Sequence, residues 1–226
     1  GKFTDNASNS NTAATEFNWT YDTTNPTVTI SASQGSDGFT SNDSTLSLTF
    51  TSTKATSNFD VNDITVTNGA LSSFTASSAT TYTATFTPSS DGAVTIDVGG
   101  NKFTGPAGNS NTASGQFNWT YDSTGPTVSS TSPSNSATSV IAQNSTISVT
   151  FSEAISTSTI TTNTSNPSCS GSFQVSSDSF SNCLQMSSAP VASNSNKTFT
   201  VLPSSMLASN TTYKIRFSTS VKDSVG

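Results

Sequence analysis

The side chains that commonly carry enzymatic chemistry are scarce in this sequence. It contains no histidine, so neither a Ser-His-Asp nor a Cys-His arrangement can form. None of its lysines completes a Ser-x-x-Lys motif. The two glutamates, Glu16 and Glu153, could supply the carboxylate pair of a glycoside hydrolase, but Glu16 lies in a repeated segment whose second copy has Gln116 instead. The sequence therefore predicts a protein that is not an enzyme, with no catalytic residues.

Calcium is the one cofactor for which the sequence offers candidate ligands. Calcium takes six to eight oxygen ligands, often from Asp carboxylates in loops. The candidates are Asp5, Asp22 and Asp122, of which the last two are followed by similar sequences. In the second copy of the repeat, Gly105 occupies the position that corresponds to Asp5, so a second site would lack that ligand. The alternative is that these aspartates form turn hydrogen bonds to backbone N–H groups.

The two cysteines, Cys169 and Cys183, lack the spacing of a metal site. No Cys-x-x-Cys motif is present and no histidine could complete a zinc site. We expect a disulfide that closes a short loop, with two free buried thiols as the alternative. A disulfide would imply an oxidising, extracellular compartment.

Two aromatic triplets alternate with polar residues. Phe17, Trp19 and Tyr21 form the first, and the second contains Trp119. Exposed tryptophans can stack on sugars, but the Phe-x-Trp-x-Tyr alternation is typical of a strand with one buried face. We therefore expect both tryptophans to lie in a core.

Charge and composition exclude two classes of partner. The net charge is −6, and the few basic residues form no cluster, so neither nucleic acid nor an anionic membrane surface is expected as a partner. No apolar run is long enough to cross a bilayer, so membrane insertion is not expected. Ser and Thr make up about 40% of the chain, and aromatic residues recur among them at strand spacing. This composition indicates thin β-strands with solvated faces.

An internal repeat sets the organisation of the chain. FTDNASNSNTAATEFNWTYD at residues 3–22 matches FTGPAGNSNTASGQFNWTYD at residues 103–122, with fourteen of twenty positions identical. The period of about one hundred residues is the size of one immunoglobulin-like domain. We expect 1–22 to be the terminal strand of a preceding module, 23–122 to be module one, and 123–226 to be module two without its final strand. Short linkers with Pro26 and Pro126 predict stiff junctions between modules placed end to end.

Period-two alternation within the modules predicts the fold class. Module one shows it at Leu46, Leu48 and Phe50, and module two at Ile147, Val149 and Phe151. Further alternating runs are Tyr82–Ala84–Phe86, Val94–Ile96–Val98, Phe199–Val201 and Tyr213–Ile215–Phe217. No segment has a helical apolar stripe. The sequence predicts an all-β protein of tandem immunoglobulin-like β-sandwiches with about seven strands each.

The same segments carry a family resemblance. STLSLTFTSTKATSNFDVNDITVTNGALSSFTASSATTYTATFTP, followed by KFTGPAGNSNTASGQFNWTYD, resembles the bacterial Ig-like repeats of large surface adhesins. PTVSSTSPSNSATSV with STISVTFSEAIS and LASNTTYKIRFSTSVKDSVG resembles a related Ig-like family. The segment with both cysteines looks like an insertion. In such adhesin repeats, acidic residues at the junctions can bind calcium and stiffen the rod.

The resemblance implies a structural or adhesive role at the cell surface. We expect a rigid extracellular stalk or filament that presents a distal binding tip, with neighbouring Ig-like modules or other copies of the chain as partners. One alternative is a carbohydrate-binding module or a spacer of a secreted polysaccharide-degrading enzyme, with an extracellular polysaccharide as partner. Another is a filament subunit assembled by strand donation, with Phe17, Trp19 and Tyr21 as the donated side chains.

Overall fold

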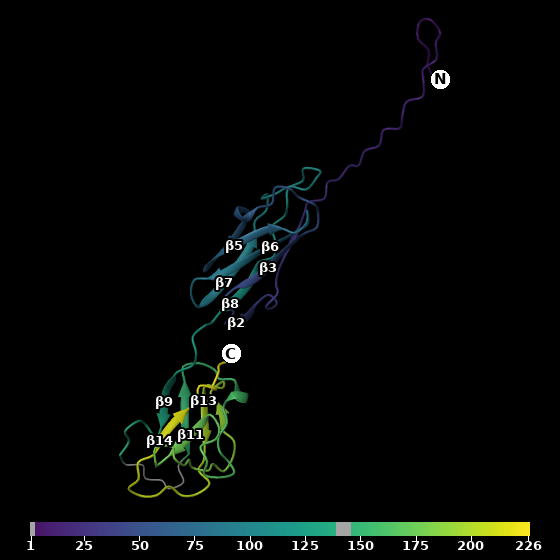
Figure 1. Cartoon of the computed structure of the whole chain (residues 1–226). Helices are drawn as coiled ribbons and strands as arrows, with labels where there is room; N and C mark the ends of the chain where they lie inside the picture. The colour runs from purple at the N-terminus through teal and green to yellow at the C-terminus, as the bar shows by residue number, and fades with distance from the viewer. Residues whose placement is uncertain (1–2, 139–145) are drawn as a thin grey trace. The chain divides into compact units, whose positions relative to one another are not determined.

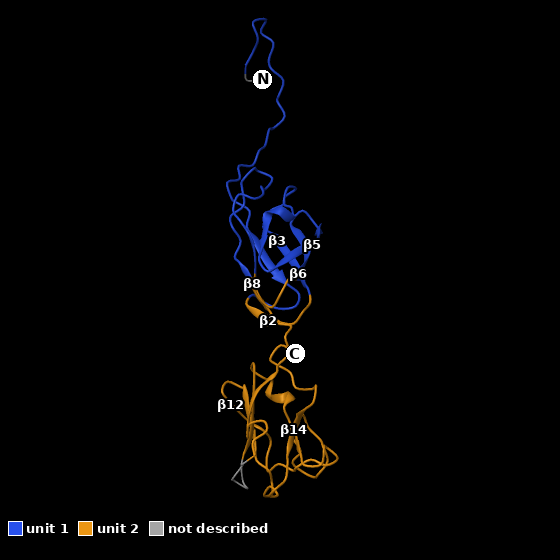
Figure 2. Ribbon diagram, turned by 90° about the vertical axis from the view of Figure 1, so that its left-hand side faces the viewer, with its two compact units in different colours: residues 1–37, 45–87, 95–117 blue, residues 38–44, 88–94, 118–226 orange. Residues whose placement is uncertain are grey.

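A computed structural model describes residues 3–138 and 146–226, and its regular structure is almost entirely β-strand (Figure 1). Two compact units can be distinguished, residues 1–37, 45–87 and 95–117 in one and residues 38–44, 88–94 and 118–226 in the other (Figure 2). The helical segments of the described chain are two 3-10 turns, η1 (Val61–Asp63) and η2 (Thr157–Thr159). The prediction of an all-β fold is confirmed.

The first sandwich consists of two four-stranded sheets. One sheet has the order β1-β3-β6-β5, with bounds β1 Val28–Ala32, β3 Leu46–Ser52, β5 Gly69–Ala76 and β6 Thr81–Pro88. The other has the order β2-β8-β7-β4, with bounds β2 Phe39–Ser41, β4 Ile64–Val66, β7 Gly92–Val98 and β8 Phe117–Tyr121. Strand β8 runs parallel to β2. In the first sheet, β3 runs antiparallel to both β1 and β6.

The alternating residues of the sequence meet across this first sheet. In the β3–β6 ladder Leu46 faces Phe86, and Phe50 faces Tyr82. All four side chains are buried, whereas the intervening Ser and Thr residues are half-buried or exposed. This is the burial pattern that a strand with one face on the core must have.

Gly69 at the start of β5 shows how closely the chain packs here. A Cβ atom at this position would lie 2.3 Å from the ring of Phe86 and 2.4 Å from the carbonyl oxygen of Thr87. Any larger residue would therefore displace a buried aromatic ring or a strand backbone. The preceding residue, Asn68, takes a positive φ of 53°, which asparagine tolerates better than most residues.

The second sandwich has a sheet with the same arrangement. The order β12-β13-β10-β9 joins β9 Val128–Ser132, β10 Ile147–Phe151, β12 Val191–Ser193 and β13 Thr198–Val201. Opposite β10, Val201 faces Ile147 and Phe199 faces Val149. The second sheet of this domain consists, within the described residues, of β11 Phe173–Ser176 and β14 Lys214–Phe217.

The core of the second sandwich contains ten buried side chains drawn from both sheets and the loops between them. They are Ile147, Val149, Phe151, Ile155, Ile160, Phe173, Val175, Met186, Phe199 and Val201. Tyr213, Ile215 and Phe217 on and beside β14 pack against this core but are only half-buried. The alternation predicted which side of β14 faces the core, but these three side chains are less buried than Val94, Ile96 and Val98 of β7.

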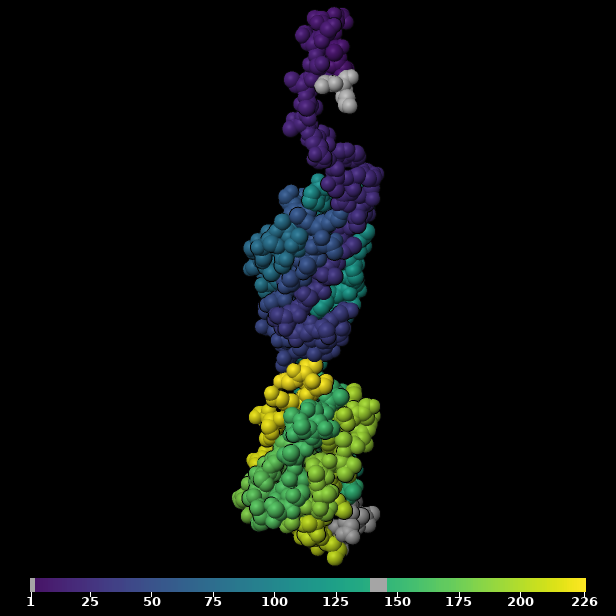
Figure 3. All heavy atoms as spheres, turned by 90° about the vertical axis from the view of Figure 1, so that its right-hand side faces the viewer, coloured from purple at the N-terminus to yellow at the C-terminus, as the bar shows by residue number. Residues whose placement is uncertain are grey.

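The N-terminal segment departs from the expectation for its aromatic residues. Residues 16–22 form no strand, and the side chains of Phe17, Trp19 and Tyr21 are 87%, 74% and 78% exposed. The space-filling view shows this purple stretch as a thin chain of atoms (Figure 3). Trp119, which is 1% exposed, lies in a core as expected, whereas residues 3–138 and 146–226 provide no core around Trp19, and the expectation that it packs in a preceding module stays a prediction.

Candidate functional site

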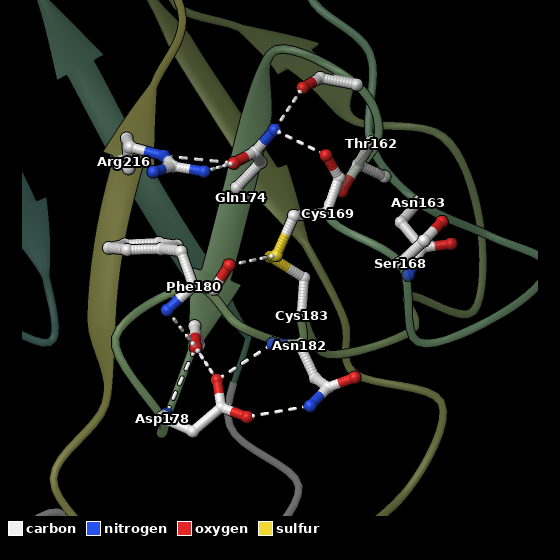
Figure 4. Close-up of a disulfide and its surroundings, with 12 residues drawn as sticks. Thr162, Asn163, Ser168, Cys169, Gln174, Asp178, Phe180, Asn182, Cys183 and Arg216 are labelled. Carbon is white, nitrogen blue, oxygen red and sulfur yellow. Dashed lines mark hydrogen bonds between the residues drawn. A yellow bond between two sulfur atoms is a disulfide. The ribbon is translucent and has the colours of Figure 1, made fainter.

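The disulfide loop is held against β14. Cys169 and Cys183 are joined by a disulfide, and β11 lies between them in the sequence. The Gln174 side-chain amide donates to the carbonyl oxygens of Cys169 (3.0 Å) and Gly171 (2.8 Å). Its oxygen accepts a 3.0 Å hydrogen bond from Nε of Arg216 on β14 (Figure 4). Gln174 therefore links the insertion to the sheet.

Arg216 has a second role in this loop. Its guanidinium lies 4.0 Å from the ring centroid of Phe180, a cation–π contact. Nearby, the Asp178 carboxylate accepts hydrogen bonds from Asn182 through both the backbone N–H and the side-chain amide, each 2.9 Å, and from the Ser176 hydroxyl at 2.8 Å. These bonds lower the pKa of Asp178 to about 2, with the backbone bond from Asn182 as the largest cause. The polar groups of this loop form hydrogen bonds with one another, as expected of a loop whose role is structural.

An acidic cluster lies where the second domain begins. Carboxylate oxygens of Asp122, Glu153 and Asp223 all lie within 4.8 Å of one another. Asp223 is buried, and its Oδ1 accepts hydrogen bonds from the backbone N–H groups of Val225 and Gly226, both 2.8 Å. Burial, and then the negative charges of Asp122 and Asp223, raise the pKa of Glu153.

This cluster is the one group of three acidic or other metal-binding side chains found among residues 3–138 and 146–226. Three carboxylates can supply part of the oxygen shell of calcium. Sequence analysis identified Asp122 as a possible calcium ligand, but not Glu153 or Asp223. No local pattern relates Glu153 and Asp223 to Asp122, because they lie 31 and 101 residues after it and come close to it only in the folded domain.

The other two calcium candidates form hydrogen bonds and an ion pair of their own. Asp5 accepts bonds from the backbone N–H groups of Ala7 (2.8 Å) and Asn9 (3.0 Å). The hydrogen bond from the Asn9 side chain, and then these backbone bonds, lower its pKa. Asp22 pairs with the ammonium group of Lys54, and its pKa is lowered chiefly by that bond. Neither belongs to the acidic cluster. The turn hydrogen bonds that the sequence left as an alternative are present for all three candidates: besides those of Asp5, the Asp22 carboxylate accepts one from the backbone N–H of Thr24 at 2.9 Å, and Asp122 accepts one from that of Thr124 at 3.3 Å.

The linker that follows the first domain is tied to one aspartate. Asp91, in the turn before β7, accepts bonds from the backbone N–H of Ser123 at 2.9 Å and from its hydroxyl at 2.7 Å, and a short one from the Thr124 hydroxyl. The bonds from Thr124 and then Ser123 lower the pKa of Asp91. No sequence pattern indicates this anchor, since residues 91 and 123 are separated by a strand, a loop and another strand.

The two tryptophans differ as candidates for ligand binding. Trp119 stacks on Phe39 at a centroid distance of 5.9 Å, and its indole N–H donates to the Ser41 hydroxyl at 3.1 Å. Because it is buried, Trp119 cannot be a platform for a sugar. Trp19 is exposed and meets Tyr21 edge to face at 6.2 Å.

Comparison with protein families identifies both halves of the chain. A family model described as "Bacterial Ig-like domain" matches residues 22–121, and a second model of the same description matches residues 122–226. A search of curated proteins gave no significant match. In the part of the chain that the structure describes, no helix has the length and apolarity to span a membrane.

Among solved structures, the chain is similar to InvD of Yersinia pseudotuberculosis, with 16% identity and a TM-score of 0.35. The alignment covers 91% of this chain and 56% of that chain, so the chain spans little more than half of that structure. A likeness this weak supports no conclusion about function. The two family matches, together with the β-sandwich architecture, show that the chain belongs to the bacterial Ig-like domains, as a tandem of two of them.

Proposed function

We propose that the chain is a structural region of an extracellular protein, in which two Ig-like domains hold a binding site carried elsewhere at a distance from the cell. The observation that carries the proposal is the anchored linker. Only four residues, 122–125, separate β8 from Pro126, and Asp91 binds two of them. Because two of its four residues are attached to the first domain, the linker has less freedom than an unattached one, which supports a spacer role.

The equivalent segment before the first domain is fixed as well. Asp22 forms an ion pair with Lys54, and its carbonyl oxygen accepts a 2.8 Å bond from the Asn109 side chain. The first junction is held through Asp22 itself, whereas the second is held through Asp91 rather than through Asp122, the equivalent of Asp22. A repeated domain whose preceding and following linkers are both restrained is suited to transmitting force along a chain of domains.

An extracellular location is supported by the disulfide and by the family. Disulfides persist in oxidising compartments and are rare in the cytosol. The absence of histidine supports a role that is not catalytic. Calcium stays a proposal, with Asp122, Glu153 and Asp223 as the residues that would hold it.

The spacer role can be tested by exchanging the two domains in the protein that the cell displays. Residues 23–226 are exchanged for two unrelated Ig-like domains of equal total length, and adhesion of the cells is measured. A spacer role predicts that adhesion is retained, and that deleting both domains without replacement reduces it. Loss of adhesion in the exchanged protein, at equal surface display, would instead assign ligand binding to these domains.

A further inference from the structure

One pair of strands joins the two ends of the first domain. The chain enters this domain through β1 and then β2, and it leaves the domain through β8. Strands β2 and β8 are neighbours in one sheet and run parallel, with Phe39 opposite Trp119 and Ser41 opposite Tyr121 (Figure 1). A strand on the entry side of the domain is therefore bonded directly to the strand on its exit side.

The parallel direction of this pair determines how tension acts on it. In a parallel pair, the N-terminal end of one strand and the C-terminal end of the other lie at opposite ends of the ladder. Tension along the chain therefore pulls β2 and β8 in opposite directions along their common axis. All hydrogen bonds of the pair are then loaded together, in shear. A pull at the same end of both strands would instead break the bonds one after another.

Further contacts strengthen the β2–β8 pair. Just before β2, the backbone N–H of Gly38 donates to the carbonyl oxygen of Asn118 at 2.8 Å. The indole N–H of Trp119 donates to the hydroxyl of Ser41 at 3.1 Å, and its ring stacks on Phe39 at a centroid distance of 5.9 Å. Because Trp119 is 1% exposed, its bond to Ser41 is shielded from competing water. Sliding of the two strands would break these contacts together with the ladder.

Extraction of either end of the first domain must break this pair. Strand β8 can leave its sheet only by separating from both of its neighbours, β2 and β7. On the entry side, β1 lies at the edge of the other sheet beside β3. If β1 separates from β3 first, the tension passes along the chain to β2, which is paired with β8. Both routes therefore include the separation of β2 from β8.

Contacts of the following linker reinforce the exit side of the pair. Directly after β8, the backbone N–H of Asp122 donates to the carbonyl oxygen of Ser41 at 3.1 Å. The next two residues, Ser123 and Thr124, bind the carboxylate of Asp91. A pull on the linker reaches these bonds before it reaches β8. The anchored linker therefore shares the load with the β2–β8 pair.

We propose that the β2–β8 pair sets the force at which the first domain unfolds when the chain is stretched. The domain keeps its fold and its length until the three paired residues of each strand slide past one another. This role rests on the proposed spacer function, which supplies the tension. The unfolding force is measured on the purified chain, whereas the domain exchange is measured on cells, so failure of one is distinguishable from failure of the other.

Single-molecule stretching of the 226-residue chain tests the proposal by the direction of the pull. Handles at Thr20, which is exposed, and at Gly125, where an added side chain would meet no neighbour within 4 Å, load the first domain alone and place β2–β8 in shear. Handles at Ser44, which is exposed and follows β2, and at Gly125 pull both strands from the same end. The unfolding force should be about threefold lower in this second geometry, because the three residue pairs then separate in turn. Equal forces in the two geometries would overturn the proposal.

A second experiment joins the two strands through a metal ion. Thr40 and Thr120 are exposed and lie opposite each other across β2–β8. The chain contains no histidine, so Thr40→His combined with Thr120→His creates a single two-histidine site for nickel. Nickel bound there holds the strands together and should raise the unfolding force in the shear geometry, and removal of the nickel with EDTA should reverse the rise.

The control for this experiment has the same site on β1–β3. Thr29 and Thr51 are likewise exposed and lie opposite each other. Nickel should raise the melting temperature of both double variants, which shows that each site forms in a folded domain. It should leave the unfolding force of Thr29→His combined with Thr51→His unchanged. A rise in force for the β1–β3 site, or no rise for a β2–β8 site whose melting temperature nickel raises, would overturn the proposal.

Discussion

The carboxylate of Asp91 binds Ser123 twice, through the backbone N–H at 2.9 Å and through the hydroxyl at 2.7 Å. A third bond, from Thr124, completes the contact. This pairing joins the turn before β7 to the segment that leads into the second domain. The structural role proposed here depends on it.

Asp91→Ala should loosen the linker while leaving both domains folded. Amide hydrogen exchange at Ser123 should become faster, because its N–H loses its acceptor. The matched control is Asp97→Ala, which removes a half-buried aspartate of β7 bonded to Gln116 and should leave exchange at Ser123 unchanged.

The same bond should depend on pH. The folded-state pKa of Asp91 lies below the ordinary value of 3.8, so its contribution is present above that value and is lost as the pH falls through the lowered pKa. Protection of the Ser123 amide should therefore persist at pH 4 and above and decline below it. Protection that declines already near pH 5 would show that another group controls the linker.

Removal of the disulfide should destabilise the second domain alone. The bridge closes a loop with a sequence separation of 14, for which the chain-entropy account gives about 3 kcal/mol. A Cys169→Ser and Cys183→Ser double variant should lower the melting transition of the second domain and leave that of the first in place. Mass spectrometry of secreted protein should find no free thiol; two free thiols would contradict the bridge.

The two tryptophans provide a matched pair of substitutions. Trp119→Ala should destabilise the first domain by about 3–5 kcal/mol, because it leaves a cavity in the core and removes the bond to Ser41. Trp19→Ala should leave the free energy of unfolding of that domain unchanged, since Trp19 is exposed. Chemical denaturation followed by circular dichroism checks both, and a large effect of Trp19→Ala would contradict the exposed position.

The acidic cluster should respond to calcium. Burial and like charges make the ionised form of Glu153 unfavourable, so in EDTA Glu153→Gln should raise the melting temperature of the second domain. Added calcium should raise that of the wild type and have less effect on the variant. Calorimetry with and without calcium measures both. An unchanged wild-type transition would reject the calcium prediction.

The strands could be predicted from the sequence because their signal is local. The alternation at Leu46, Leu48 and Phe50 requires only that one face be buried, and the structure buries all three. The environment of FNWTY could not be predicted in this way. Trp19 and Trp119 have the same neighbours in sequence, but among the described residues only Trp119 lies in a strand, β8, that is paired within a sheet.

The acidic cluster and the linker anchor escaped prediction for a related reason. Glu153 follows a core strand and Asp223 lies near the last described residues, and nothing in their local sequence relates them to Asp122. Asp91 and Ser123 are likewise brought together by the path of β7 and β8. Contacts between distant polar residues depend on the register of the strands, which alternation alone does not determine.

Residual dipolar couplings of backbone amides in a weakly aligned sample test the structural role most directly. If the anchored linker makes the two domains a spacer, couplings from residues 28–121 and from residues 128–217 should fit one alignment tensor of common magnitude in the wild type, and two tensors of different magnitude in Asp91→Ala. Two tensors of different magnitude already in the wild type would show domains that reorient freely, and would contradict the account.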